Sequence, residues 1–293
     1  MPDRLDRLLT LLDIETLDAN LFRGQSRDDG FKQLYGGQVV AQALVAATRT
    51  VPKDRPAQSL HAYFLRPGDL HLPIIYEVER IRDGGSFTTR RVQAIQNSVP
   101  IFSMMVSFHA PEDGWDHQPA MPEVPAPEGL ISGTRLFAEW QAGPPEASPG
   151  LLGVKVIAER AGIEIRPALD LQSKAGETPG RQRLWIRCTG DRPPPPEWHT
   201  VLLAYASDFD LIGTAKLPHG GYYGQPDMMM ASLDHAIWFH RPANFDDWLL
   251  YCIDAPTAAA GRAFITGRLY DRAGRLLAST TQEGLMRRLR ARV

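Results

Sequence analysis

The sequence has few cysteines and lacks the short motifs that mark many enzyme classes. Its 293 residues include two cysteines, Cys188 and Cys252, which lie far apart and outside any Cys-x-x-Cys pair. Each lies in an apolar, strand-like run, which is typical of a buried free thiol in a reducing compartment. Gly-x-Ser-x-Gly, His-Glu-x-x-His, Gly-x-Gly-x-x-Gly and a glycine-rich Lys-Ser/Thr loop are all absent. These absences disfavour a serine-hydrolase elbow, a zinc protease site and a nucleotide loop, so we expect no metal and no cofactor.

The chain also lacks a surplus of charge and a long apolar run. Its formal net charge is −2, and its one dense basic stretch is the arginine-rich segment 287–292, which is more typical of a solvated chain end than of a nucleic-acid site. The first residues carry acids before a short leucine run, unlike a signal peptide, and no later run is long enough to span a bilayer. We therefore predict a cytoplasmic protein that binds neither nucleic acid nor membranes.

Two stretches of the chain resemble each other. Residues 59–67 read Ser-Leu-His-Ala-Tyr-Phe-Leu-Arg-Pro, and residues 232–242 read Ser-Leu-Asp-His-Ala-Ile-Trp-Phe-His-Arg-Pro. Their Arg-Pro pairs lie 175 residues apart (241 minus 66), and at the same offset Ser107 falls beside Gln282. His61 matches His235 in this comparison, so both histidines are interpreted as structural. A tandem duplication predicts two similar modules, with function where they meet.

The order of expected elements supports two modules. Leucines at helical spacing predict a short amphipathic helix over 3–16, and small and apolar residues predict a buried helix over 38–50. A second buried helix is expected over about 197–209, and residues 111–150 are proline-rich. Strands are predicted at 57–66, 73–82, 86–96, 100–109, 162–169, 183–188, 231–240, 248–256, 262–270 and 275–286. We predict an α+β fold with a module at 1–112, a connection at 113–150 and a module at 151–293, each an antiparallel sheet around a long helix.

Three polar residues of the second module interrupt otherwise apolar elements. Asp208 ends the second buried helix, Ser232 begins a strand and Gln282 lies in the last strand. Each also has a simpler interpretation, because Asp208 could be a surface acid and strand serines are usually structural. Strand alternation sends Ser232 and Asp234 to one face and His235 to the other.

Several runs of the sequence are similar to the acyl-CoA thioesterase II (TesB) family. They are Leu21-Phe-Arg-Gly-Gln-Ser, Tyr35-Gly-Gly-Gln-Val-Val-Ala-Gln-Ala-Leu, Tyr63-Phe-Leu-Arg-Pro-Gly-Asp, Ala94-Ile-Gln-Asn, Ala204-Tyr-Ala-Ser-Asp, Asp234-His-Ala-Ile-Trp-Phe-His-Arg-Pro and Gln282-Glu-Gly-Leu-Met-Arg. They occur in order and span nearly the whole chain. The resemblance implies a double hotdog fold.

The resemblance also implies roles for single residues. The family's catalytic aspartate falls on Asp208, its glutamine on Gln282 and its hydroxyl residue on Ser232, where many members have threonine. These residues would hold and activate a water that hydrolyses a fatty acyl-CoA thioester without a covalent intermediate. Backbone N–H groups at a glycine-led helix start are natural donors to the oxyanion.

Two other functions remain open. One is an enoyl-CoA hydratase on the same fold, which would need an Asp/His pair such as Asp234 with His235, and the other is an acyl-CoA-binding protein without catalysis. In each case the expected partner is acyl-CoA, and spare sheet faces suggest a homo-oligomer.

Overall fold

The computed structural model describes residues 3–28, 33–142, 161–168, 179–220 and 227–289, in which thirteen antiparallel strands form one sheet. The expected boundary between residues 150 and 151 and the end of the arginine-rich segment lie outside them. The strands are β1 (Glu15–Asp18), β2 (Leu21–Gly24), β3 (Ala57–Phe64), β4 (Ile74–Asp83), β5 (Phe87–Gln96), β6 (Val99–His109), β7 (Ile163–Pro167), β8 (Arg181–Cys188), β9 (Met228–Ser232), β10 (Asp234–Phe239), β11 (Leu249–Ala259), β12 (Arg262–Asp271) and β13 (Leu276–Arg288). Their order is β1-β2-β4-β5-β6-β3-β10-β13-β12-β11-β8-β7, with β9 also paired to β13.

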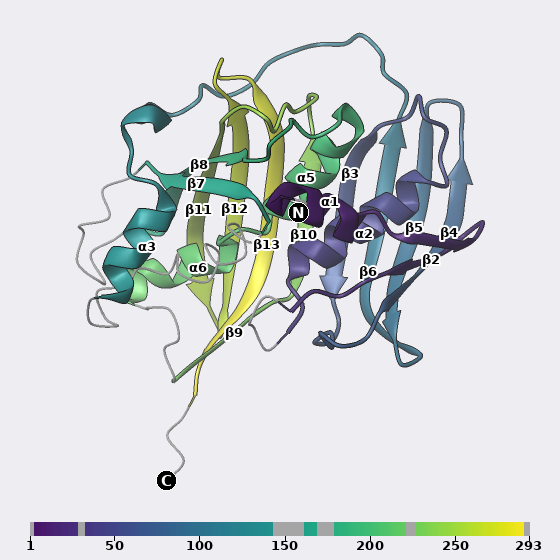
Figure 1. The fold of residues 1–293 in the computed structure, drawn as a ribbon, viewed down its shortest axis with the longest axis horizontal. Coiled ribbons are helices and arrows are strands. Elements are labelled where there is room, and N and C mark those ends of the chain that lie inside the picture. Colours follow the sequence, from purple (N-terminus) through teal and green to yellow (C-terminus); the bar gives the residue numbers. More distant parts are fainter. Residues whose placement is uncertain (1–2, 29–32, 143–160, 169–178, 221–226, 290–293) are drawn as a thin grey trace.

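The sheet consists of two halves that meet where β3 pairs with β10 (Figure 1). Tyr63 pairs with Asp234 across this junction, and Ser59 pairs with Trp238. At the offset of 175, Trp238 is the copy of Tyr63 and Asp234 is the copy of Ser59, so one pair is the copy of the other. The offset found in the sequence therefore maps the junction onto itself, which is the behaviour of a local two-fold axis between duplicated modules.

Helices lie against the sheet (Figure 1). They are α1 (Arg4–Leu12), α2 (Gly36–Thr48), α3 (Gly133–Gln141), α5 (His199–Ala206) and α6 (Leu211–Lys216), with 3₁₀ turns at Pro127–Gly129, Pro196–Trp198 and Leu217–His219. Of these helices, α1, α2 and α5 lie near the junction of the two halves, and α3 lies beside β7 at the far end of the second half. The residues of α2 are small or apolar on nearly every side, so the helix is buried between β4, β5, β6 and α5.

The helix expected over about 197–209 is shorter in the structure, and a second short helix follows it. α5 ends at Ala206, and α6 begins at Leu211. Between them Asp210 has a left-handed backbone with φ of 52°, which a continuous right-handed helix does not allow. Its carboxylate accepts a hydrogen bond from the Gln182 amide of β8. This interruption places Asp208 in a turn and not on a helix face.

The prediction that Ser232 and His235 face opposite sides of the sheet was wrong. Ser232 pairs with Gly284 and Ala236 pairs with Thr281. An advance of four residues along β9 and β10 therefore corresponds to an advance of three residues along β13. One extra residue reverses the alternation that a regular strand would keep. Both Ser232 and His235 consequently face the helices.

The sequence match between His61 and His235 is displaced by one residue. His61 pairs with Ala236, which is its copy at the offset of 175, and it is exposed on the outer face of the sheet. His235 is fully buried on the inner face, where its copy in the first module is Leu60. The buried histidine therefore occurs in one module alone.

The copy of Gln282 is Val106 and not Ser107. Gln282 pairs with Ile265, whose copy at the offset of 175 is Arg90, and Arg90 pairs with Val106. Tyr270 pairs with Leu276, whereas its copy Ile95 pairs with Pro100, so the turn between β12 and β13 is one residue longer than that between β5 and β6, which accounts for the one-residue difference. At this position the first module has a buried apolar side chain.

Part of the proline-rich connection packs on the second half of the sheet. Trp185 Nε1 donates to the carbonyl of Pro125 at 2.9 Å, and Gln118 Nε2 donates to the carbonyl of Gly274 at 2.6 Å. Within the described ranges, no helix is both apolar enough and long enough to cross a membrane.

Candidate active site

Asp208 lies where the two modules meet and is partly buried. Its Oδ1 accepts a hydrogen bond from Gln282 Nε2 of β13 at 2.8 Å. Its Oδ2 accepts one from the backbone N–H of Gly37, in the first turn of α2, at 2.9 Å. One carboxylate is thus held by a side chain of the second module and by the backbone of the first.

Burial raises the pKa of the Asp208 carboxyl from 3.8 to about 6, although the hydrogen bonds from Gln282 and Gly37 lower it in part. At pH 7 a carboxyl group with this pKa is ionised in about ten molecules for each one that is protonated. Asp208 is therefore a carboxylate of increased basicity, which suits a group that accepts a proton near neutral pH.

Gln282 is held by a second buried residue, His235. Gln282 Nε2 lies 3.4 Å from His235 Nδ1, and His235 Nε2 lies 2.9 Å from Ser207 Oγ. Burial lowers the pKa of His235 to about 3, so its ring is neutral at physiological pH. Gln282 Oε1 is also buried and accepts no hydrogen bond within the described chain.

Ser232 lies on the same face of the sheet as Gln282. It pairs directly with Gly284, two residues along β13, which makes Ser232 a diagonal neighbour of the glutamine. A Cβ at Gly284 would overlap Ile212 of α6, so this part of the sheet packs closely against the helix. Of the three expected residues, the structure joins Asp208 and Gln282 by a hydrogen bond and places Ser232 nearby without such a bond in the described chain.

The glycine pair at the start of α2 has a role that the sequence did not identify. A Cβ at Gly37 would overlap the carbonyl oxygen of Tyr205, and one at Gly36 would lie 2.8 Å from Asp208 Oδ2. Glycine lets the helix start approach the second module this closely. Oxyanion donors were expected at a glycine-led helix start without assignment to particular residues, and at this one the Gly37 N–H donates to Asp208.

The Asp/His pair required by the hydratase alternative is not formed. Asp234 Oδ1 accepts from the backbone N–H of Glu283 at 2.6 Å, whereas the ring of His235 contacts Ser207 and Gln282. The two neighbouring side chains therefore have separate partners.

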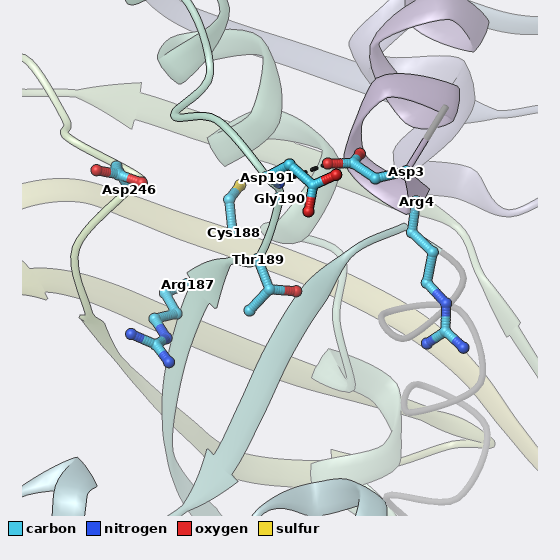
Figure 2. Close-up of a pocket in the computed structure, with 8 residues that line it drawn as sticks. All are labelled: Asp3, Arg4, Arg187, Cys188, Thr189, Gly190, Asp191 and Asp246. Carbon is cyan, nitrogen blue, oxygen red and sulfur yellow. Dashed lines mark hydrogen bonds between the residues drawn. The ribbon is translucent and has the colours of Figure 1, made fainter. Parts of the chain in front are cut away.

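A surface hollow elsewhere in the molecule lies between the start of α1 and the end of β8 (Figure 2). It has a volume of about 540 Å³ and carries charges of both signs, including Asp3, Arg187 and Asp246. Asp3 Oδ2 accepts from the N–H of Asp191 at 2.6 Å across it. Burial raises the pKa of the Cys188 thiol far above its usual value, so this cysteine is no nucleophile at neutral pH. The residues that line the hollow include neither Asp208 nor Gln282, so the hollow is separate from the Asp208 site.

Comparison with known proteins gives a consistent result over the whole chain. The model of the "Acyl-CoA thioesterase" family matches residues 157–285, and that of the "Acyl-CoA thioesterase N-terminal domain" matches residues 27–109. Acyl-CoA thioesterase 2 of Haemophilus influenzae is 42% identical over 288 residues, which cover 98% of this chain and 99% of that protein. The chain belongs to the acyl-CoA thioesterase II (TesB) family. It is therefore a member of a family of thioester hydrolases.

Further relatives agree with this assignment. Human acyl-coenzyme A thioesterase 8 is 39% identical over 286 residues, which cover 95% of this chain and 88% of the human protein. The crystal structure of an acyl-CoA thioesterase II, TesB2, from Mycobacterium marinum is 37% identical and superposes with a TM-score of 0.77, covering 96% of this chain and 98% of that one. The double hotdog fold predicted from the sequence is confirmed by this likeness.

Proposed function

We propose that this thioesterase family member hydrolyses fatty acyl-CoA to a free fatty acid and CoA, with a water activated by Asp208, Gln282 and Ser232. The observation that carries this proposal is the hydrogen-bonded pair of Asp208 and Gln282 at the meeting of the two modules, with the carboxylate pKa raised to about 6. Both its partly buried position and its basicity suit a general base.

The reaction follows from the groups present. Each Asp208 oxygen already accepts one hydrogen bond and retains a lone pair for a water. As the water oxygen bonds to the thioester carbonyl carbon, Asp208 accepts its proton. The tetrahedral intermediate then breaks its C–S bond and releases the CoA thiolate, which takes up the proton held by Asp208 and so restores the carboxylate. A thiol of this kind has a pKa of about 8.5, so the thiolate leaves readily and no acyl-enzyme is needed.

Gln282 and Ser232 act on the same water in this proposal. Gln282 Oε1 is a buried acceptor without a partner in the described chain, and the Ser232 hydroxyl faces the same side of the sheet. Two such groups beside Asp208 would restrict the water to orientations in line with the carbonyl carbon.

The test is release of free thiol from acyl-CoAs of increasing chain length. The wild-type protein should turn over, and Asp208→Asn should lose about two or more orders of magnitude in kcat. Asp234→Asn is the matched control, because this carboxylate lies on the neighbouring strand and bonds only the Glu283 backbone among the described residues. It should keep its rate.

The same experiment separates the two alternatives. A hydratase would add water to the double bond of enoyl-CoA, retain the thioester and depend on Asp234. An acyl-CoA-binding protein would bind substrate and release no thiol. Either result would overturn the proposed hydrolysis.

We further propose a cytoplasmic homo-oligomer built from modules at 1–112 and 151–293, with the catalytic residues in the second. Two buried free thiols, Cys188 and Cys252, support a reducing compartment. Exposed Tyr63 and Met105 on the outer face of the sheet support self-association. Light scattering on the purified protein should give a mass above that of one chain.

A further inference from the structure

A chain of hydrogen bonds lies behind Asp208 and includes two side chains, Ser207 and His235, with no direct part in the proposed reaction. Ser207 Oγ donates to the carbonyl of Ala204 at 2.8 Å and lies 2.9 Å from His235 Nε2. His235 Nδ1 lies 3.4 Å from Gln282 Nε2, which donates to Asp208 Oδ1 at 2.8 Å. Ser207 and His235 are fully buried, and Gln282 is 1% exposed.

The Ala204 carbonyl at one end of this chain determines which atom donates and which accepts in each of the other hydrogen bonds. The Ala204 carbonyl can only accept, so the single hydroxyl proton of Ser207 points to it. Ser207 Oγ must then accept from His235 Nε2–H, which leaves His235 Nδ1 without a proton. A bare Nδ1 accepts, so the Gln282 group that faces it is the NH₂ and not the oxygen. Both hydrogens of Gln282 Nε2 are consequently committed, one to His235 and one to Asp208.

The orientation of the Gln282 amide matters because the reverse orientation would place an oxygen against the Asp208 carboxylate. We infer that His235 and Ser207 are positioning residues for the reaction, which hold Gln282 with Nε2 toward Asp208 and Oε1 toward the attacking water. Gln282 Oε1 is buried and accepts no hydrogen bond in the described chain, as this role requires. The inference rests on the proposed function, since it assigns the water's second acceptor to Gln282.

The first module provides an internal comparison. The copies of His235 and Gln282 there are Leu60 and Val106, both fully buried, and the corresponding strands pair in the same way. These sheet positions therefore accept apolar side chains without loss of the fold. The polar pair of the second module is not needed to build the sheet, and a leucine at position 235 should fit.

The pKa of Asp208 indicates whether the Gln282 amide still donates a hydrogen bond to it. The Gln282 hydrogen bond lowers the pKa of Asp208, so loss of that bond should raise it. Among the described residues, the other groups that interact with Asp208 or its partner Gln282 stay neutral. Burial lowers the pKa of His235 to about 3 and raises that of Tyr251 far above neutrality, and Gly37 contributes only its backbone N–H. A displaced acid limb of the pH profile would therefore indicate a released Gln282.

The experiment compares His235→Leu, His235→Asn and Ser207→Ala with the wild-type protein and Asp208→Asn. The readouts are kcat, KM, the pH dependence of kcat/KM and thermal melting. His235→Leu should lower kcat about tenfold, as expected for one lost hydrogen bond in the transition state, with little change in KM. Its acid limb should move to higher pH. His235→Asn should recover kcat to within about threefold of the wild type, because its Oδ1 can accept where Nδ1 does.

Ser207→Ala tests the same inference without altering the sheet. Loss of Oγ removes the group that fixes the histidine tautomer, so kcat should fall and the acid limb should rise as in His235→Leu. This variant decides the outcome if His235→Leu does not fold.

Three results would overturn the positioning role. One is a folded His235→Leu with the rate and acid limb of the wild type. Another is a lowered rate with an unmoved limb and no recovery in His235→Asn, which would indicate packing alone. The third is a Ser207→Ala protein that behaves as wild type. Failure of the proposed function is distinct, because there the wild-type protein releases no thiol or Asp208→Asn keeps full activity.

Discussion

Asp208→Asn should stabilise the protein while it lowers kcat by about two orders of magnitude or more. The pKa of Asp208 is raised from 3.8 to about 6, which means that the fold disfavours the charged carboxylate relative to the unfolded chain. At about 1.4 kcal/mol for each pH unit, this rise corresponds to about 3 kcal/mol of unfolding free energy at pH 8. An asparagine removes that cost, although it can satisfy only one of the donors Gln282 and Gly37. A gain of about 2 kcal/mol should remain, or about 3 °C in melting temperature for a chain of this length.

The pH dependence of this gain is the sharper test. The folded pKa is raised, so the stability that Asp208 contributes is fully present below pH 3.8 and is lost as pH rises through about 6. The advantage of Asp208→Asn should therefore be largest at pH 8 and should disappear near pH 4. Calorimetry of both proteins at several pH values between 4 and 8 measures it. A variant that is less stable than the wild type at pH 8, or a difference that does not change with pH, would refute the reasoning.

Three further results are expected. Gly37→Ala should lower kcat by about a hundredfold, because its Cβ overlaps the Tyr205 carbonyl and displaces the N–H that holds Asp208, whereas Gly85→Ala, which has open space at its Cβ, should be neutral in the same assay. Ser232→Ala should lower kcat about fivefold through the loss of one neutral hydrogen bond, and Ser232→Thr should stay within about threefold; equal rates for all three proteins would remove Ser232 from the site. The kcat/KM of the wild type should fall as pH drops below about 6, where Asp208 becomes protonated, and a profile that is flat down to pH 4.5 would exclude it as the base.

Much of the fold could be predicted from the sequence because the duplication keeps one offset over most of its strands. Strands β5 and β12 begin at 87 and 262, which differ by 175, and the observed strands lie close to the predicted runs. The short strands β1 and β2 and the separate strand β9 were not predicted. Each of them has four or five residues, which is too short for a clear alternating pattern.

The candidate site could be predicted in part. The resemblance indicated Asp208 and Gln282, which the structure joins by a hydrogen bond. The roles of Gly37 and His235 were missed, since a backbone N–H carries no sequence signal and a one-residue bulge reverses the face on which His235 lies. Bulges depend on the pairing of distant strands and cannot be read from one strand alone. The Tyr35-Gly36-Gly37 run was the available clue to a close approach.

The contact between Gly37 of the first module and Asp208 of the second has a consequence for how the site assembles. Because both groups belong to one polypeptide, their encounter is intramolecular and its effective concentration is independent of dilution. A single-module protein that builds such a site by dimerisation would lose activity as it is diluted below its dissociation constant. This chain should keep its specific activity at any enzyme concentration, whether or not whole chains associate, and two separately expressed halves should regain activity only in proportion to their association.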